Sequence, residues 1–527
     1  MPDQKSKSGR LGVLLFNSFA NLIRAFSTSL TTILLPLILV FSMSTSAYAV
    51  WVVVFGVASY AIYLDLGLQA TIQARVGRLY GHDVAGAHQV ALSGLGLIAV
   101  VNGLFLLLLL VVAGVLGQIF PEIPSRLLLE AQVSLVILTA AQLANVSTNV
   151  VSAFYVGAQR SIEPALISSS ARVLSLILTV AVASLTTNLI ALACAFALPV
   201  FAGFVALLVR FFRERKVHRR PAEALAESQW WSLLKYSGPL IVWSVCMLIV
   251  NGLGVILVAR FDYSAVPAYS IAMMFVAAIV GLDNAITAPL LSEFGRVDSL
   301  RGRDAMAYAV QTSTRWNTGL LFVLAACLIL VAWPLLRAAP IESGQTGAFG
   351  VMVVAILASA LRLCMTPLSM AFIATRTHMR VLWPPVVEAA ANLAASVVLG
   401  SLLGVMGVAL GALFGSVVGV ALALGWSIRV AKLEEVSVWT LFSRGLLKPI
   451  SLLTISLVAS ILVPFISPYP LLGTSLLTLP FVILGLVFFW TGSVNRAERR
   501  ALLTILKRRG KSVKAQEWLL VPALLEK

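Results

Sequence analysis

The chain has 527 residues, of which 60% are hydrophobic and 11% are charged, and its mean hydropathy is +0.98. This composition excludes a soluble globular protein and is typical of a membrane protein that crosses the bilayer many times. A net charge of +17 in a soluble protein would suggest nucleic-acid binding, but here the positions of the charges favour a membrane topology signal. The four cysteines lie in apolar segments without metal-ligand spacing, so we expect packing roles for them.

We predict an all-α integral membrane protein, because a bilayer is crossed by about 20 apolar residues in a helix. The first apolar segment is too long for a signal peptide, and we expect it to remain as an uncleaved span. Fourteen candidate spans lie near residues 14–40, 47–68, 89–116, 131–156, 164–186, 190–209, 236–259, 265–290, 308–336, 346–372, 381–401, 405–428, 449–467 and 472–492.

The basic residues are distributed unequally between the two sides that these spans define. With both termini inside, the inner segments hold 31 of the 38 lysines and arginines, and the outer loops hold only Arg126, Arg260 and Arg337. Cytoplasmic loops are enriched in Lys and Arg, so this asymmetry predicts that both termini are cytoplasmic. The tail Asn495–Lys514 alternates leucines with basic residues, which predicts an amphipathic helix on the membrane surface.

A weak internal repeat divides the chain into two related halves. The stretch from Ser46 to Tyr80 reads SAYAVWVVVFGVASYAIYLDLGLQATIQARVGRLY, and a shift of 218 positions maps Leu64–Asp65 onto Leu282–Asp283. We therefore predict pseudo-symmetric six-helix lobes, two added helices and basic connecting segments. The predicted boundaries are 1–210 for the first lobe, 211–235 for a basic linker, 236–430 for the second lobe, 431–492 for the helix pair and 493–527 for the tail.

Charged side chains within spans are costly, so each is a candidate for lining a cavity or forming a buried pair. Four guanidinium groups against one carboxylate predict a chamber that attracts an anion, such as a phosphate or diphosphate. None of the four arginines is repeated as Arg or Lys 218 positions away, as expected for residues that serve a ligand. The alternatives are that arginines near the inner boundary extend to the headgroups, and that one arginine and the glutamate neutralise each other. These residues are Arg24, Arg172, Arg315, Arg362 and Glu388.

Asp65 and Asp283 occupy equivalent places in the two halves, just before predicted inner loops. With Glu388, they are candidates for coupling transport to a proton or sodium gradient. The alternative is a shared structural role, either pairing with Arg78 and Arg296 or capping the following turn. The four histidines fall in predicted inner loops, where a solvated or headgroup-facing side chain is the default. The sequence contains no metal-binding, phosphate-loop or hydrolase motif, so we expect no enzymatic activity, no bound metal and no cofactor.

A stripe of glycines, Gly407, Gly411, Gly415 and Gly419, forms one smooth face of the twelfth span. Such a face predicts close packing against another helix. Prolines within or near the ends of spans, such as Pro239 and Pro367, predict bends.

The first span with Asn17, Arg24 and Pro36, the YAVWVVVFGVASYAIYLDLGLQATIQARVGR stretch and the glycine-striped GVMGVALGALFGSVVGV segment resemble bacterial polysaccharide flippases. These belong to the multidrug/oligosaccharidyl-lipid/polysaccharide (MOP) exporter superfamily. The resemblance extends over residues 11 to about 490. It implies two six-helix lobes around a central cavity, two extra helices, and translocation of a polyprenyl-diphosphate-linked oligosaccharide across the bacterial inner membrane by alternating access.

Residue chemistry agrees with such a cargo. Cations in the inner half of the cavity suit a diphosphate, and a lateral gap between lobes suits the lipid tail. Aromatic and amide side chains suit sugars, and the candidates are Gln142, Asn145, Asn149, Trp243 and Asn251. Expected partners are this substrate and membrane lipids, but no nucleic acid; a polysaccharide polymerase and glycosyltransferases are candidate protein partners.

Other functions remain open. A peptidoglycan-precursor flippase shares the cationic cavity, and a multidrug cation antiporter shares the superfamily, although it is expected to carry carboxylates in its cavity. A membrane-embedded glycosyltransferase or ligase, and a non-transporting scaffold for envelope assembly, are further alternatives. No outer loop exceeds roughly 15 residues, which disfavours an enzyme with an external acceptor site.

Overall fold

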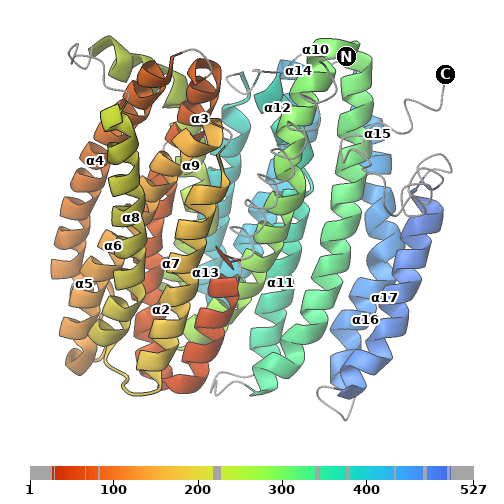
Figure 1. Ribbon diagram of the computed structural model, residues 1–527. Coiled ribbons are helices and arrows are strands. Elements are labelled where there is room, and N and C mark those ends of the chain that lie inside the picture. Colours follow the sequence, from red (N-terminus) through yellow and green to blue (C-terminus); the bar gives the residue numbers. More distant parts are fainter. Residues whose placement is uncertain are drawn as a thin grey trace. The chain divides into compact units, whose positions relative to one another are not determined.

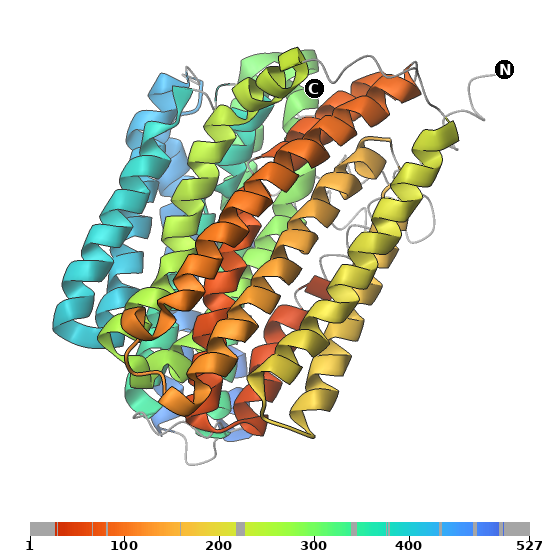
Figure 2. The same ribbon diagram turned by 90° about the vertical axis from the view of Figure 1, so that its left-hand side faces the viewer.

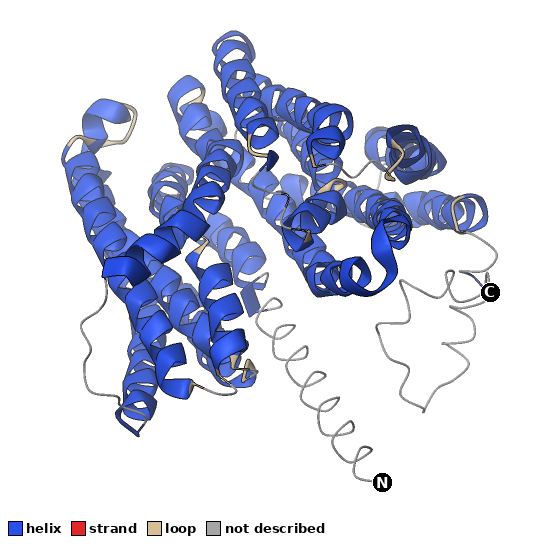
Figure 3. Ribbon diagram, turned by 90° about the horizontal axis from the view of Figure 1, so that it is seen from above, coloured by secondary structure: helices blue, strands red, loops and turns tan. Residues whose placement is uncertain are grey.

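The computed structural model describes residues 27–499, except for 29, 66, 81–82, 159, 218–226, 339–344, 376, 378–379, 432–434, 467–471 and 495–498. Within these ranges the chain consists of helices joined by short turns, as seen along the helices in Figure 3. A bilayer interior offers the backbone no water to bond, so a spanning segment bonds to itself as a helix. The predicted all-α membrane fold is confirmed.

The described residues include eleven helices long and apolar enough to cross a membrane. One of them, Trp383–Val430, contains two predicted spans, and Leu30–Ser42 and Thr478–Gly492 are shorter apolar helices. Gly404 lies between the two spans of Trp383–Val430 with φ 59 and ψ −138, a left-handed conformation that favours glycine and reverses the chain there. Together these segments agree with about fourteen spans.

By internal packing the chain divides into two units, Met1–Met274 and Phe275–Lys527. The predicted lobe boundaries rest on the sequence repeat instead, and they remain predictions. In unit 1, α6 packs against α4 and α8, and α7 packs against α8, which Figure 2 shows side by side. The elements of unit 1 are α2 (Thr45–Ser59), η1 (Tyr60–Asp65), α3 (Leu68–Leu79), α4 (Val84–Gly114), α5 (Leu116–Ile119), α6 (Ser125–Gly157), α7 (Ile162–Ala183), α8 (Leu189–Val217), α9 (Glu227–Phe261), η2 (Tyr263–Ala265) and the start of α10 (Val266–Ala338).

The core of unit 1 at the predicted inner end contains His88, which is only 3% exposed. Its ring lies 4.4 Å from that of Phe154 and 5.5 Å from that of Phe211, and its Nδ1 pairs with the carbonyl of Val84. The expectation of a solvated His88 is therefore wrong, because α4 begins at Val84 and draws the histidine into the helix packing. The other three histidines lie outside the described residues.

Four charged side chains join the ends of α6, α7 and α8 in unit 1. Arg160 contacts Glu163 at 2.9 Å and Glu214 at 3.0 Å, and Arg210 contacts the same two glutamates at 2.7 and 3.3 Å. Burial alone would lower the pKa of Arg160, but hydrogen bonds to Glu214, Tyr80 and Glu163 raise it above the ordinary value. The guanidinium therefore stays charged and holds three helix ends together.

In unit 2, α11 packs against α13, and α16 packs against α17, which lie side by side in Figure 1. Pro367 occupies the first turn of α12, a position that tolerates proline. The elements of unit 2 are the remainder of α10, α11 (Gln345–Leu363), α12 (Thr366–Ala374), α13 (Trp383–Leu422), the π-helical η4 (Ala423–Ser427), α14 (Ile428–Val430), α15 (Val438–Thr440), the π-helical η5 (Leu441–Leu447), α16 (Lys448–Ile466) and α17 (Leu472–Gly492).

The two halves of the predicted repeat differ in their inner connections. In the first half, Gly67 adopts φ 68 and interrupts the helix before α3. In the second half Ala285 replaces this glycine, and α10 runs on as one helix of 73 residues through the predicted inner loop. An L-residue disfavours the left-handed conformation that glycine tolerates, so the break is not repeated.

Candidate functional site

A break in a membrane-spanning helix is the starting point of the polar site in unit 2. The span Gly347–Ala374 is interrupted where α11 ends at Leu363 and α12 begins at Thr366. In a continuous helix the carbonyl of Leu363 would accept a hydrogen bond from the amide of residue 367, but that residue is Pro367 and has no N–H. The Nδ2 atom of Asn317 donates to this carbonyl instead, at 3.0 Å.

The same amide nitrogen connects the break to a buried carboxylate. Asn317 Nδ2 also donates to Asp283 Oδ1 at 2.9 Å, and Thr366 Oγ1 donates to Asp283 Oδ2 at 2.9 Å. Asp283 is 0% exposed and Asn317 is 2% exposed. The Asp283 cluster, formed by Asp283, Asn317, Thr366 and the carbonyl of Leu363, therefore joins both parts of α10 to the α11–α12 break. Each carboxylate oxygen has a donor, as a buried anion requires.

A second polar seam lies inside the hairpin of α13. Its two arms run antiparallel, so polar residues of the first arm face glycines of the second in order. A Cβ atom added to Gly419 would lie 2.5 Å from Glu388 Cδ, and one added to Gly415 would lie 2.6 Å from Asn392 Cβ. A Cβ on Gly411 would meet Ser396, and one on Gly407 would meet the carbonyl of Leu399. The predicted close packing of the glycine stripe is confirmed, and its partner is a row of polar side chains.

Arg362 connects the two polar groups of unit 2. It lies near the end of α11 and interacts electrostatically with both Asp283 and Glu388. The choice between a neutralising pair of Arg362 and Glu388 and a coupling site stays open, because the guanidinium is shared between two carboxylates. The structure thus places three of the predicted site residues in one neighbourhood. Asn317 and Thr366 were missed, and Pro367, which leaves a carbonyl needing a donor, was the available signal.

The aspartate of the first half is placed differently. Asp65 ends η1, and its carboxylate accepts a hydrogen bond from the backbone N–H of Gln69 in the first turn of α3. This contact is the capping of the turn that was expected as the alternative to ion coupling. Asp283 instead lies within α10 and bonds side chains across helices, so the two aspartates have different local roles.

The predicted anion-binding arginines divide between the units. Arg172 of α7 donates from its guanidinium to Asn145 Oδ1 of α6 at 3.1 Å, so one of the amides proposed for sugar contacts holds one of the arginines. Arg172, Arg315 and Arg362 are all half-buried rather than exposed on the helix surface. Arg24 lies outside the described residues. A chamber shared by the four remains a prediction.

Hydrogen bonds join α2 and η1 to the elements after residue 250 within unit 1. Tyr48 Oη of α2 and Ser270 Oγ are 2.8 Å apart, and Tyr60 Oη of η1 donates to the carbonyl of Gly252 at 2.7 Å. Tyr48 is fully buried. These bonds hold the start of α10 on α2 and α9 on η1, which explains why both pack with the first unit.

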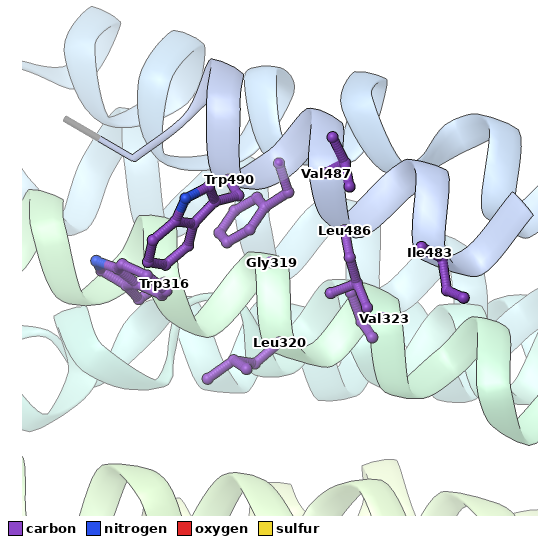
Figure 4. A pocket seen from close by; sticks show the side chains of 9 residues that line it. Trp316, Gly319, Leu320, Val323, Ile483, Leu486, Val487 and Trp490 are labelled. Carbon is purple, nitrogen blue, oxygen red and sulfur yellow. The ribbon is translucent and has the colours of Figure 1, made fainter. Parts of the chain in front are cut away.

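An apolar groove lies between the second part of α10 and α17. Its volume is about 340 Å³. Trp316, Leu320 and Val323 line one side, and Leu486, Val487 and Trp490 line the other (Figure 4). Gly319 forms the base of the α10/α17 groove, where a Cβ atom would meet the ring of Phe489. Such a surface can hold a hydrocarbon chain but offers no partner to a charged group.

Comparisons with known proteins were made by sequence and by structure. No family model matches the chain, and no curated protein matches it. A structure of the lipid II flippase MurJ in its inward closed conformation matches with a TM-score of 0.66 and 12% identity, and covers 94% of this chain and 100% of MurJ. An inward-facing multidrug resistance MATE family transporter of the MOP superfamily matches with a TM-score of 0.57 and 17% identity, and covers 78% of this chain and 96% of that one.

A MOP superfamily transporter from Pyrococcus furiosus, whose binding pocket is described as having reverse polarity, matches with a TM-score of 0.58 and 17% identity over 80% of this chain and 96% of its own. The chain has the MOP transporter fold. The fold implied by the resemblance to polysaccharide flippases is therefore confirmed. With the apolar helices, the MOP fold makes this a multi-pass integral membrane protein.

Proposed function

We propose that this MOP-fold protein moves a polyprenyl-diphosphate-linked oligosaccharide from the inner to the outer leaflet of a bacterial inner membrane by alternating access. The observation that carries the proposal is the extent of the match to a lipid flippase. The MATE and Pyrococcus transporters leave 20 to 22% of this chain unmatched, whereas MurJ leaves 6%. Residues 431–527, which follow the two predicted lobes, make up a share of the chain close to the part that the MATE and Pyrococcus transporters leave unmatched.

The chemistry of the described residues supports an anionic, lipid-linked cargo. A diphosphate is bound best by guanidinium groups, which donate in a planar fork. Arg172 is held in position by Asn145, and Arg315 and Arg362 are half-buried on membrane-spanning helices. The α10/α17 groove, which is almost wholly apolar, suits the lipid tail. Cations for the headgroup and a separate apolar surface for the chain are what such a substrate needs.

A peptidoglycan-precursor flippase is the second candidate, because the MurJ structure named above acts on lipid II. Its cargo belongs to the same chemical class, so the residues above suit both. A multidrug cation antiporter is less favoured, since a cationic drug would meet guanidinium groups. The orientation with both termini in the cytoplasm follows from the basic residues of the inner segments.

Two complementation experiments distinguish the candidates. The full-length protein is expressed in a bacterium lacking its polysaccharide flippase and in one depleted of its lipid II flippase. Restored surface polysaccharide in the first, without rescue of growth in the second, is the expected result. Growth rescue alone would assign the protein to peptidoglycan synthesis. Failure of both, with normal protein abundance in the membrane, would overturn the proposed function.

A further inference from the structure

The two buried carboxylates near Arg362 have unequal surroundings. Asp283 has a hydrogen-bond donor on each oxygen, from Asn317 and from Thr366, and this arrangement stabilises its ionised form. Glu388 has no hydrogen-bond partner on Oε1, although this oxygen is buried and the residue is only 9% exposed. The surroundings of Asp283 therefore stabilise an ionised carboxylate, whereas those of Glu388 leave one carboxylate oxygen without a hydrogen-bond donor.

The neighbours of Glu388 offer it little solvation. On the facing arm of α13, Gly419 lies against the carboxyl group and supplies no side chain. One turn further along the same arm as Glu388, Asn392 is 5% exposed and its Nδ2 has no hydrogen-bond partner. From α11, Arg362 is the charged group that acts on Glu388, and it acts on Asp283 as well. An ionised Glu388 thus leaves two carboxylates sharing one guanidinium in a region of low dielectric.

We propose that Glu388 binds and releases one proton in each transport cycle, while Asp283 stays ionised and holds the α11–α12 break. The carboxylate of Glu388 takes a proton from water on one side of the membrane, becomes a neutral carboxylic acid, and returns the proton to water on the other side. Protonation removes the negative charge of Glu388. The positive charge of Arg362 is then matched by the single negative charge of Asp283.

A proton fits this site better than a sodium ion. Hard cations are bound by shells of several oxygen ligands. Beside Glu388, the unpartnered amide atom of Asn392 is its nitrogen, and the charged group from α11 is the guanidinium of Arg362, so neither is a ligand for a cation and the second repels one. A proton needs only the carboxylate itself. This assignment specifies the coupling ion for the proposed transport and rests on that proposal only for its role in the cycle.

The test follows the carboxyl C=O stretching band by infrared difference spectroscopy of the full-length protein in lipid nanodiscs. A titration is run on the wild-type protein labelled with ¹³C-glutamate or ¹³C-aspartate, without any cargo. Other carboxyl groups titrate too, so the band of interest is the part of the wild-type signal that Glu388→Gln removes. This band is expected to grow as the pH falls and to shift with the glutamate label. Asp283→Asn is expected to leave it in place, and Glu388→Asp to restore a titrating band that responds to the aspartate label.

Three results would overturn the proposal: no difference in the titrating bands between the wild-type protein and Glu388→Gln, a difference band that shifts with the aspartate label, or a difference band that disappears when sodium replaces choline at constant pH. If Glu388→Gln does not fold, Glu388→Asp still gives an answer, because the band must then pass from the glutamate label to the aspartate label. Because no cargo is present, failure of this test is independent of the complementation experiments. Proton binding by a protein that restores neither bacterium would leave this inference intact and overturn the proposed function alone.

Discussion

The amide of Asn317 replaces a backbone donor that Pro367 removes from the α11–α12 span. One nitrogen serves two acceptors, the carbonyl of Leu363 and the carboxylate of Asp283. A buried acceptor that loses its donor costs about 1–3 kcal/mol, and more if it is charged. Asn317 is therefore expected to contribute to stability twice, once through the broken helix and once through the buried anion.

Replacing Asn317 by leucine is expected to lower the free energy of unfolding of the purified protein by about 2–4 kcal/mol, since two buried acceptors lose their donor. Adding Pro367→Ala restores an N–H opposite Leu363, so the double variant is expected to be more stable than the sum of the single effects predicts. Denaturation in detergent gives the free energy of unfolding of the wild-type protein, the two single variants and the double variant. Strict additivity would contradict the role assigned to the amide. Asn251→Leu is a matched control, because that amide is exposed and donates to the carbonyl of Met247 within its own helix turn.

Arg172 offers a second test of a single side chain. Arg172→Ala is expected to reduce flipping of a lipid-linked glycan at least about tenfold without lowering membrane abundance, because a charge-assisted hydrogen bond is worth about 1.5–3 kcal/mol. Transport into proteoliposomes, measured with a quenchable label on the glycan, gives the rate. Arg126→Ala removes the same charge from an exposed position in the first turn of α6 and is expected to change nothing. Equal rates for both variants would remove Arg172 from the cargo path.

The α13 hairpin shows what determines the packing of a pair of membrane helices. Apolar side chains gain little by leaving lipid for another helix, so close approach of backbones and hydrogen bonds drive association. Glycines on the second arm create room for Glu388, Asn392 and Ser396 on the first. The stripe therefore buries polar groups between two helices rather than exposing them to hydrocarbon.

A single added methyl group tests this packing. Gly415→Ala places a Cβ atom within 2.9 Å of Asn392 Cα, where backbone must move, and is expected to destabilise the protein by about 1–3 kcal/mol. Gly103→Ala in α4 meets no atom within 4 Å and is expected to be neutral or slightly stabilising, by up to about 1 kcal/mol, through its better helix propensity. Thermal denaturation in the same detergent compares them. A tolerated Gly415→Ala would show that the hairpin is looser than described.

The chain as a whole combines polar helix contacts with an apolar groove in which α17 takes part. Arg172 lies in unit 1, and Arg315 and Arg362 lie in unit 2, where the Asp283 cluster and the α10/α17 groove are also found. The proposed headgroup site and the proposed tail site consist of different side chains, although both include residues of α10. The two predicted sites are therefore separable by substitution.

A side chain that fills the α10/α17 groove is expected to reduce transport of cargoes with long lipid tails more than transport of cargoes with short tails. Gly319→Leu places a side chain against Phe489, and transport of a glycan on a long polyprenyl diphosphate is expected to fall at least fivefold, with a smaller change for a short-tailed analogue. The quenching assay in proteoliposomes compares the two substrates. Gly347→Leu, at a position with nothing within 4 Å, controls for the added bulk. Equal losses for both tails would show that the groove does not hold the cargo chain.

Hydropathy and charge determined the membrane class, the number of spans and the predicted orientation, because these depend on the local composition of each segment. The glycine stripe of α13 likewise indicated close packing, since its spacing follows from helix geometry. Only the tertiary structure showed that Asn317 compensates for Pro367, that Asp283 and Glu388 share Arg362, and that His88 is buried. Those relations join residues 26 to 123 positions apart, and helix packing brings them together in a way that no local pattern records.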